Sequence, residues 1–233
     1  MPYLIVLFSL IAIYVVVIFT MKYLTNKLLT NIIFVAIITI CYITFSTIIY
    51  LDVGPHDWNF TNILPTANIS PFMFALTPLI LLLPKQIKKY FFTLVSLLVV
   101  GMFLSVVFNC VYNTVINYKL HFHFVVDYVA HITISLWGIY LVKSKQVDLT
   151  IKNCLITTAI MLGIITIMLV INIIFDTSFF GLNLNGKHNI YNIVLVSNSY
   201  LSALIYYFAV VIVMFLGFIF QKLMLYKRNK VYQ

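Results

Sequence analysis

The sequence predicts an all-α polytopic membrane protein. Residues 1–233 are expected to form a single transmembrane helical domain, in which short loops join the helices. Hydrophobic residues make up 64% of its 233 residues and charged residues only 8%, with a mean hydropathy of +1.11. A soluble domain is about half apolar and a quarter charged. The apolar residues also come in runs of the length that crosses a bilayer, about 18 residues or more. Finally, the basic residues gather in alternate loops between these runs.

Seven apolar runs predict seven transmembrane helices, at about 3–20, 29–50, 70–84, 91–111, 123–142, 154–175 and 200–220. The first run has no basic segment before it and no small-residue cleavage site after it, which is typical of a retained helix rather than a signal peptide. The third run is short and contains Pro78. A six-helix protein in which this segment does not cross the membrane is therefore the alternative.

The distribution of basic residues predicts the orientation of these helices. Of the 14 Lys and Arg residues, only Lys119 and Lys187 fall outside the loops after the first, third and fifth runs and the basic tail 222–233. Cytoplasmic loops carry such an excess of Lys and Arg. We therefore expect the N-terminus outside the cell and the C-terminus and its tail in the cytoplasm.

The net charge of +9 is expected to face anionic lipid rather than nucleic acid. The abundance of Ile, Phe, Tyr, Asn and Lys is typical of an AT-rich genome, which favours a multi-pass protein of a bacterial plasma membrane. The cysteines Cys41, Cys110 and Cys154 form no CxxC pair and are predicted to be small buried side chains. No ATP-binding motif is present, and we expect neither a cofactor nor a resident metal.

The predicted topology places all five histidines and four of the five aspartates on the outer side. Several polar residues there interrupt apolar runs, and polar groups in lipid need partners on facing helices. These residues predict an outward-opening polar cavity. The alternative is that outer loops simply carry polar residues. The candidate substrate-binding residues are Asn68, Asn109, Asn172 and Ser202.

The stretch 122–131 carries the strongest candidate site. His123, Asp127 and His131 are spaced four residues apart, which puts them on one stripe of a helix. At 1.5 Å per residue, Asp127 lies about 6 Å and His131 about 12 Å deeper than His123. Ionisable groups inside a membrane are costly and by default indicate function.

Three roles remain open for this stripe. His131 is a candidate general base or nucleophile oriented by Asp127. The trio is also a candidate metal site, although its spacing is weaker than the HExxH signature. A proton relay in a transporter is the third role. Against these stands a purely structural hydrogen bond between helices.

Ser70 is the third candidate catalytic residue, beside His131 and Asp127. It precedes Pro71 at the start of the third run, which is the pattern of a helix N-cap followed by proline in the first turn. A structural capping role is therefore the alternative to a position at the mouth of the cavity.

Several motifs resemble those of the YwaF-like integral membrane family, which includes animal transmembrane acyltransferases that act on ether phospholipids. The resemblance rests on the seven-helix layout, on Leu64-Pro65 before the third helix, on His131 in the fifth, and on Gly181-Leu-Asn before the last. It implies a seven-helix fold and acyl transfer. The family carries a nucleophilic cysteine shortly after the Leu-Pro pair, whereas 66–70 contains none. Ser70 is the candidate replacement.

Three functions follow as hypotheses. The first is an enzyme that transfers or hydrolyses the acyl group of a lipid, with His131 as base and Ser70 as nucleophile. The second is a transporter or permease component that uses Asp127 and His131 to bind a proton or solute. The third is a non-catalytic partner in a membrane complex.

Overall fold

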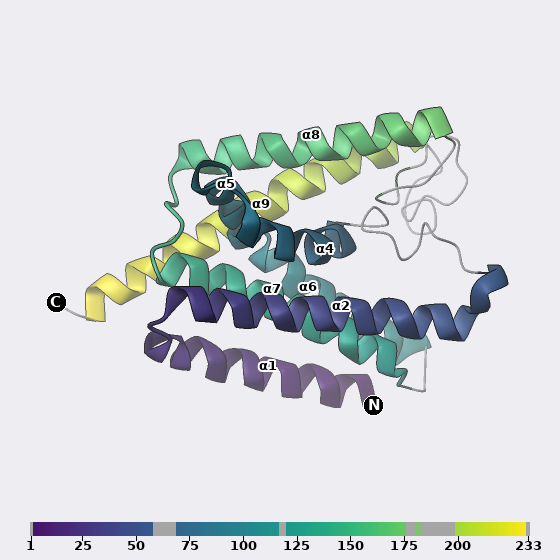
Figure 1. The fold of residues 1–233 in the computed structure, drawn as a ribbon, viewed down its shortest axis with the longest axis horizontal. Coiled ribbons are helices and arrows are strands. Elements are labelled where there is room, and N and C mark those ends of the chain that lie inside the picture. Colours follow the sequence, from purple (N-terminus) through teal and green to yellow (C-terminus); the bar gives the residue numbers. More distant parts are fainter. Residues whose placement is uncertain are drawn as a thin grey trace.

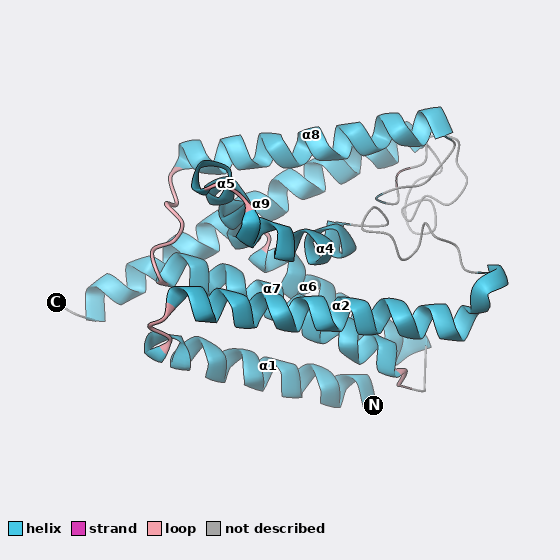
Figure 2. Ribbon diagram, viewed as in Figure 1, coloured by secondary structure: helices cyan, strands magenta, loops and turns pink. Residues whose placement is uncertain are grey.

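The computed structural model describes residues 2–57, 69–116, 120–175, 180, 182 and 199–231. These residues form a bundle of helices joined by short loops, with no strand among them (Figures 1 and 2). The helices are α1 (Pro2–Thr20), the 3-10 turn η1 (Met21–Tyr23), α2 (Lys27–Asp57), α4 (Ile69–Leu82), α5 (Lys85–Leu97), α6 (Val99–Ile116), α7 (Phe122–Lys143), α8 (Ile151–Phe175) and α9 (Ser199–Val231).

Six helical segments in the described part of the chain are long and apolar enough to cross a membrane. They are Pro2–Tyr23, Lys27–Leu51, Lys85–Val115, Phe122–Lys143, Ile151–Phe175 and Ala203–Leu225. This result confirms a multi-pass helical membrane protein. The third predicted helix forms as α4, but its 14 residues span only about 21 Å at 1.5 Å per residue, less than the ~30 Å hydrocarbon core.

Several helices extend beyond their predicted ends. The run predicted at 91–111 is part of a longer segment, because α6 follows α5 after Leu98 alone. The Leu98 amide donates to the Leu94 carbonyl, and the Met102 amide donates to the Leu98 carbonyl, so the hydrogen-bonded path continues across the junction. Likewise α2 reaches Asp57 and α9 reaches Val231. Hydropathy marks only the apolar part of a helix, whereas backbone hydrogen bonding continues into the polar flanks.

Helix α7 lies at the centre of the bundle (Figure 1) and is the most buried of the six apolar segments. Its close approach to α5 and α6 depends on Gly138. A Cβ at this position would lie 2.7 Å from the Val95 carbonyl oxygen and 2.5 Å from a methyl group of Val99. Only glycine fits between these backbones without displacing one of them.

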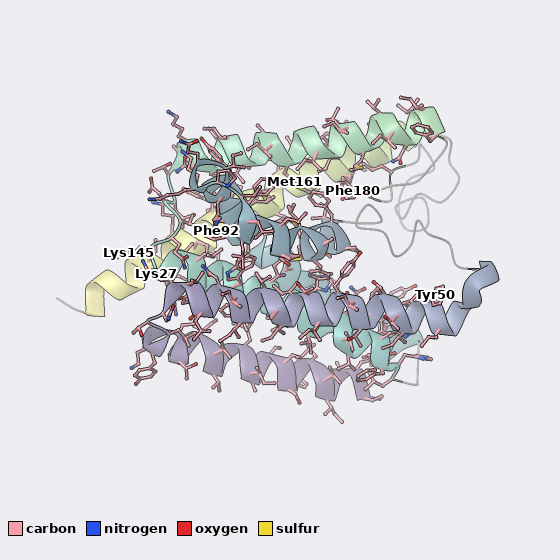
Figure 3. All side chains as sticks on the ribbon, viewed as in Figure 1. Lys27, Tyr50, Phe92, Lys145, Met161 and Phe180 are labelled. Atoms are coloured by element: carbon pink, nitrogen blue, oxygen red, sulfur yellow. The ribbon has the colours of Figure 1, made fainter. Side chains whose placement is uncertain are left out.

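The lysine-rich loops meet at one end of the bundle. Figure 3 shows Lys27 and Lys145 at this end and Tyr50 toward the other. Polar side chains here close the bundle: Lys143 Nζ donates to the Ile18 carbonyl at 3.0 Å, and Lys88 Nζ donates to the Leu81 carbonyl. These amine groups satisfy carbonyls near helix ends that lack a partner in the helix itself.

A buried amide network ties α2 to α7 near the same end. Trp137 Nε1 donates to Asn31 Oδ1 at 3.0 Å, and Asn31 Nδ2 donates to Gln146 Oε1 at 2.8 Å. Trp137 is fully buried and Asn31 is nearly so. Both polar groups of Asn31 are thus paired, as buried amides require.

The cysteines have the predicted character of packing residues. Cys110 and Cys154 are buried, Cys41 is half-buried, and all three are free thiols.

Candidate functional site

Asp127 and His131 lie together on α7, one helical turn apart. His131 Nδ1 is 2.8 Å from the Asp127 backbone carbonyl oxygen and 3.3 Å from the carboxylate oxygen Oδ1. A carbonyl oxygen only accepts hydrogen bonds, so Nδ1 must carry the proton. In the neutral ring this leaves Nε2 with its lone pair, as a general base requires.

The His131 side chain is enclosed, whereas Asp127 retains access to its surroundings. His131 is 4% exposed, and the side chain of Asp127 is 22% exposed. The edge-to-face contact between the Phe74 and His131 rings has a centroid distance of 5.0 Å. Phe74 comes from α4, so the pair belongs to an interface between helices.

Helix α2 forms the third wall of this site. The ring of Tyr42 lies against Phe74, with centroids 6.3 Å apart. Further along α2, Phe45 contacts His123, with centroids 6.4 Å apart. Helices α2, α4 and α7 therefore meet around Phe74 and the His131 ring.

The packing of these helices determines which polar residues share a level. Helices α4 and α7 run toward the lysine-rich end, and α2 runs away from it (Figures 1 and 3). Ser70 precedes Phe74 by one turn, just as Asp127 precedes His131. Four residues rise about 6 Å along a helix axis, so Ser70 and Asp127 both lie on the side of the Phe74–His131 contact away from Lys27. Ser70 is half-buried in the first turn of α4.

The other predicted substrate-binding residues do not gather around His131. Asn109 is exposed on α6 and donates to Ser105 of the same helix at 3.3 Å. Asn172 is buried on α8, and its side-chain amide donates to the Leu182 carbonyl. This bond holds Leu182 against α8. Asn68 and the side chain of Ser202 lie outside the described residues.

The sequence interpretation missed the contribution of α2. Thr39, Tyr42 and Ser46 follow one another at intervals of three and four residues, a helical stripe that the apolar run 29–50 contains. This periodicity was a usable signal. Neutral hydroxyl side chains in an apolar run indicate a functional site less strongly than a carboxylate or an imidazole does.

Within the described ranges, no group of three or more His, Cys, Asp or Glu side chains is arranged to hold a metal ion. The site there consists of one carboxylate, one imidazole, hydroxyl groups and aromatic rings. This donor set suits proton transfer and hydrogen bonding. Comparison with known proteins found no matching family model, no similar curated protein and no similar solved structure.

Proposed function

We propose that this protein is an integral membrane enzyme that transfers or hydrolyses the acyl group of a lipid, with His131 as the general base. The observation that carries the proposal is the bond from His131 Nδ1 to the Asp127 carbonyl, which leaves Nε2 to accept a proton. The nearby carboxylate stabilises the imidazolium once that proton has arrived. In this mechanism the acyl lipid reaches the site from the bilayer by lateral diffusion.

The proposed reaction uses a hydroxyl group as nucleophile. His131 Nε2 takes the proton as the hydroxyl oxygen attacks the ester carbonyl carbon of the lipid. The tetrahedral intermediate then collapses, the ester C–O bond breaks, and the alcohol leaves with the proton returned by Nε2. Ser70 is the proposed nucleophile because it lies on the same side of the Phe74–His131 contact as Asp127, on a helix that contacts His131 through Phe74. Water or an acceptor alcohol then attacks the acyl-serine carbonyl, with His131 Nε2 again taking the proton of the nucleophile, and the Ser70 oxygen leaves and takes this proton back from Nε2. If water attacks the lipid ester itself, the first steps give hydrolysis directly.

The test uses purified protein reconstituted in liposomes of bacterial lipid extract with labelled acyl chains. His131→Ala is expected to abolish acyl release or transfer. The exposed His121 supplies the matched control, since His121→Ala removes an imidazole next to the same helix. Unchanged turnover in His131→Ala would refute the mechanism. Ser70→Ala separates the nucleophiles, because loss of activity supports an acyl-serine and retained hydrolysis supports water.

A second candidate function is proton-coupled transport, and the position of the pair favours it. Asp127 and His131 lie on the most buried of the apolar helices, which other helices of the bundle face. Polar pairs within membrane helices mark proton and solute pathways in transporters. Solute uptake that survives both Asp127→Asn and His131→Ala would rule out this function.

The proposed topology is that of seven crossings, with α4 as the third, the N-terminus outside and the C-terminus in the cytoplasm. The lysine-rich end of the bundle supports it through the positive-inside rule. The seven-helix layout is also what the resemblance to the YwaF-like family implies. We propose the bacterial plasma membrane as its location. Reporter fusions after Tyr50 and after Gln233 should report opposite sides of the membrane, and fusions on the same side would contradict the topology.

A further inference from the structure

Two buried hydroxyl groups on α2 lack the partner that similar groups in this chain have. Thr30, Thr47 and Thr133 each donate to the carbonyl four residues earlier, at 2.7–2.8 Å. This is the usual way in which a membrane helix satisfies a hydroxyl. The buried oxygens of Thr39 and Ser46 make no hydrogen bond within the described part of the chain.

Both hydroxyl groups lie at the proposed site. Thr39 and Ser46 flank Tyr42 at intervals of three and four residues, so the three share one face of α2. The contact between Tyr42 and Phe74 shows that this face packs against α4. Ser46 Oγ lies near the Tyr42 hydroxyl without reaching hydrogen-bond geometry.

The helix register brings Ser46 close to the reacting groups. Ser46 follows Tyr42 by one turn, and Ser70 precedes Phe74 by one turn on the antiparallel helix α4. Phe45 contacts His123, which is one turn from Asp127, so the neighbouring Ser46 lies at the His123 end of the stripe that carries Asp127 and His131. The unpartnered hydroxyls thus extend the site along α2.

One edge of this face is open at the surface of the bundle. Ile40 is 63% exposed and Ile43 is 57% exposed, and both adjoin the hydroxyl stripe on the outer surface of the bundle. A lipid that approaches the bundle from the bilayer meets these two side chains first.

The charges near the hydroxyls select for an uncharged lipid. The described lysine side chains lie in or beside the helix ends at the lysine-rich end of the bundle, about three or more turns of α2 from Ser46. The Asp127 carboxylate lies about one helical turn from the level of Ser46 and repels a phosphate group, and the imidazole of His123 contacts Phe45 beside Ser46. Hydroxyl groups donate hydrogen bonds to ester carbonyl oxygens, and an uncharged ester needs no cationic side chain to bind it.

We propose that Thr39 and Ser46 bind the ester oxygens of an uncharged glycerolipid such as diacylglycerol, and hold one ester beside His131. This inference rests on the acyl-transfer function proposed above and names its substrate class. In this arrangement an ester oxygen of the lipid accepts the hydrogen bond for which each hydroxyl has no other partner in the described part of the chain.

Photolabelling in phosphatidylcholine vesicles tests the inference. The probes are a photoactivatable diacylglycerol and a photoactivatable phosphatidate with the same acyl chains, and labelled peptides are identified by mass spectrometry. Thr39→Val and Ser46→Ala are each expected to reduce diacylglycerol labelling of α2 by about two- to tenfold, the loss of one hydrogen bond. Thr47→Val is the matched control, because Thr47 is exposed on the same helix and donates to Ile43. Equal elution profiles and melting temperatures show that the variants are folded.

The outcomes separate this inference from the catalytic proposal. Wild-type labelling in both Thr39→Val and Ser46→Ala overturns the binding role, as does phosphatidate labelling equal to that of diacylglycerol. His131→Ala should keep its labelling while it loses turnover. If His131→Ala keeps its turnover while the α2 variants lose labelling, the catalytic mechanism fails and the binding site stands.

Discussion

Replacement of Asp127 by asparagine separates two roles that a carboxylate beside a histidine can have. One role is to fix the ring tautomer, and the other is to stabilise the positive charge of the protonated ring. In this protein the Asp127 backbone carbonyl lies 2.8 Å from Nδ1, closer than the carboxylate oxygen at 3.3 Å. The backbone carbonyl remains in Asp127→Asn. The tautomer should therefore survive the substitution, and only the charge is lost.

The magnitude follows from the remaining role. A hydrogen bond to a charged group contributes about 1.5–3 kcal/mol, and each 1.4 kcal/mol is about tenfold in rate. These values give a loss of acyl turnover of about 10- to 150-fold for Asp127→Asn. We expect the loss to fall in the lower part of this range, because the carboxylate is 22% exposed and its charge is partly screened. When the carboxylate itself fixes the tautomer, as in the serine-protease triad, its amide replacement costs about 10⁴-fold.

The assay compares acyl turnover in liposomes for Asp127→Asn, His131→Ala and the wild type. Nitrogen NMR of protein labelled at histidine reports the tautomer directly, without reference to the reaction. Retention of the Nδ1–H form together with an intermediate loss of turnover is the expected result. A switch to the Nε2–H form, or a loss as large as that of His131→Ala, would refute the assignment of the tautomer to the backbone carbonyl.

Two further predictions concern the packing that holds the central helix α7. Gly138→Ala should destabilise the protein by about 1–3 kcal/mol, because the new methyl group meets the Val95 carbonyl. The control is Gly163→Ala, whose methyl group meets nothing within 4 Å and should not lower the melting temperature in detergent. If Gly138→Ala melts at the same temperature as the wild type, the close approach of α7 to α5 is contradicted. Trp137→Phe should lower the free energy of unfolding by about 1–3 kcal/mol, because it leaves the buried Asn31 Oδ1 without its donor. The double variant Trp137→Phe/Asn31→Leu should recover part of this loss. If the effects of the two substitutions on stability simply add, the hydrogen bond between the two side chains is contradicted.

Local features of the sequence predicted much of the site. The pairing of Asp127 with His131 depends only on helical spacing, because residues four apart on a helix are neighbours whatever surrounds them. The same spacing also joins Asn109 to Ser105 on α6. A polar side chain in an apolar run thus has a local partner or a distant one, and sequence alone does not distinguish them. Asn109 was predicted for the cavity and uses the local partner.

The sequence by itself determined the membrane class and the positions of the apolar helices, because hydropathy and charge are sums over neighbouring residues. Only the tertiary structure decided that α4 packs against His131 through Phe74, and that the hydroxyl stripe of α2 faces the same place. The order of helices in a bundle and their rotation about their axes depend on contacts between distant residues, such as the fit of Gly138 against α5. These contacts have no local pattern, since lipid and protein interior favour the same apolar side chains.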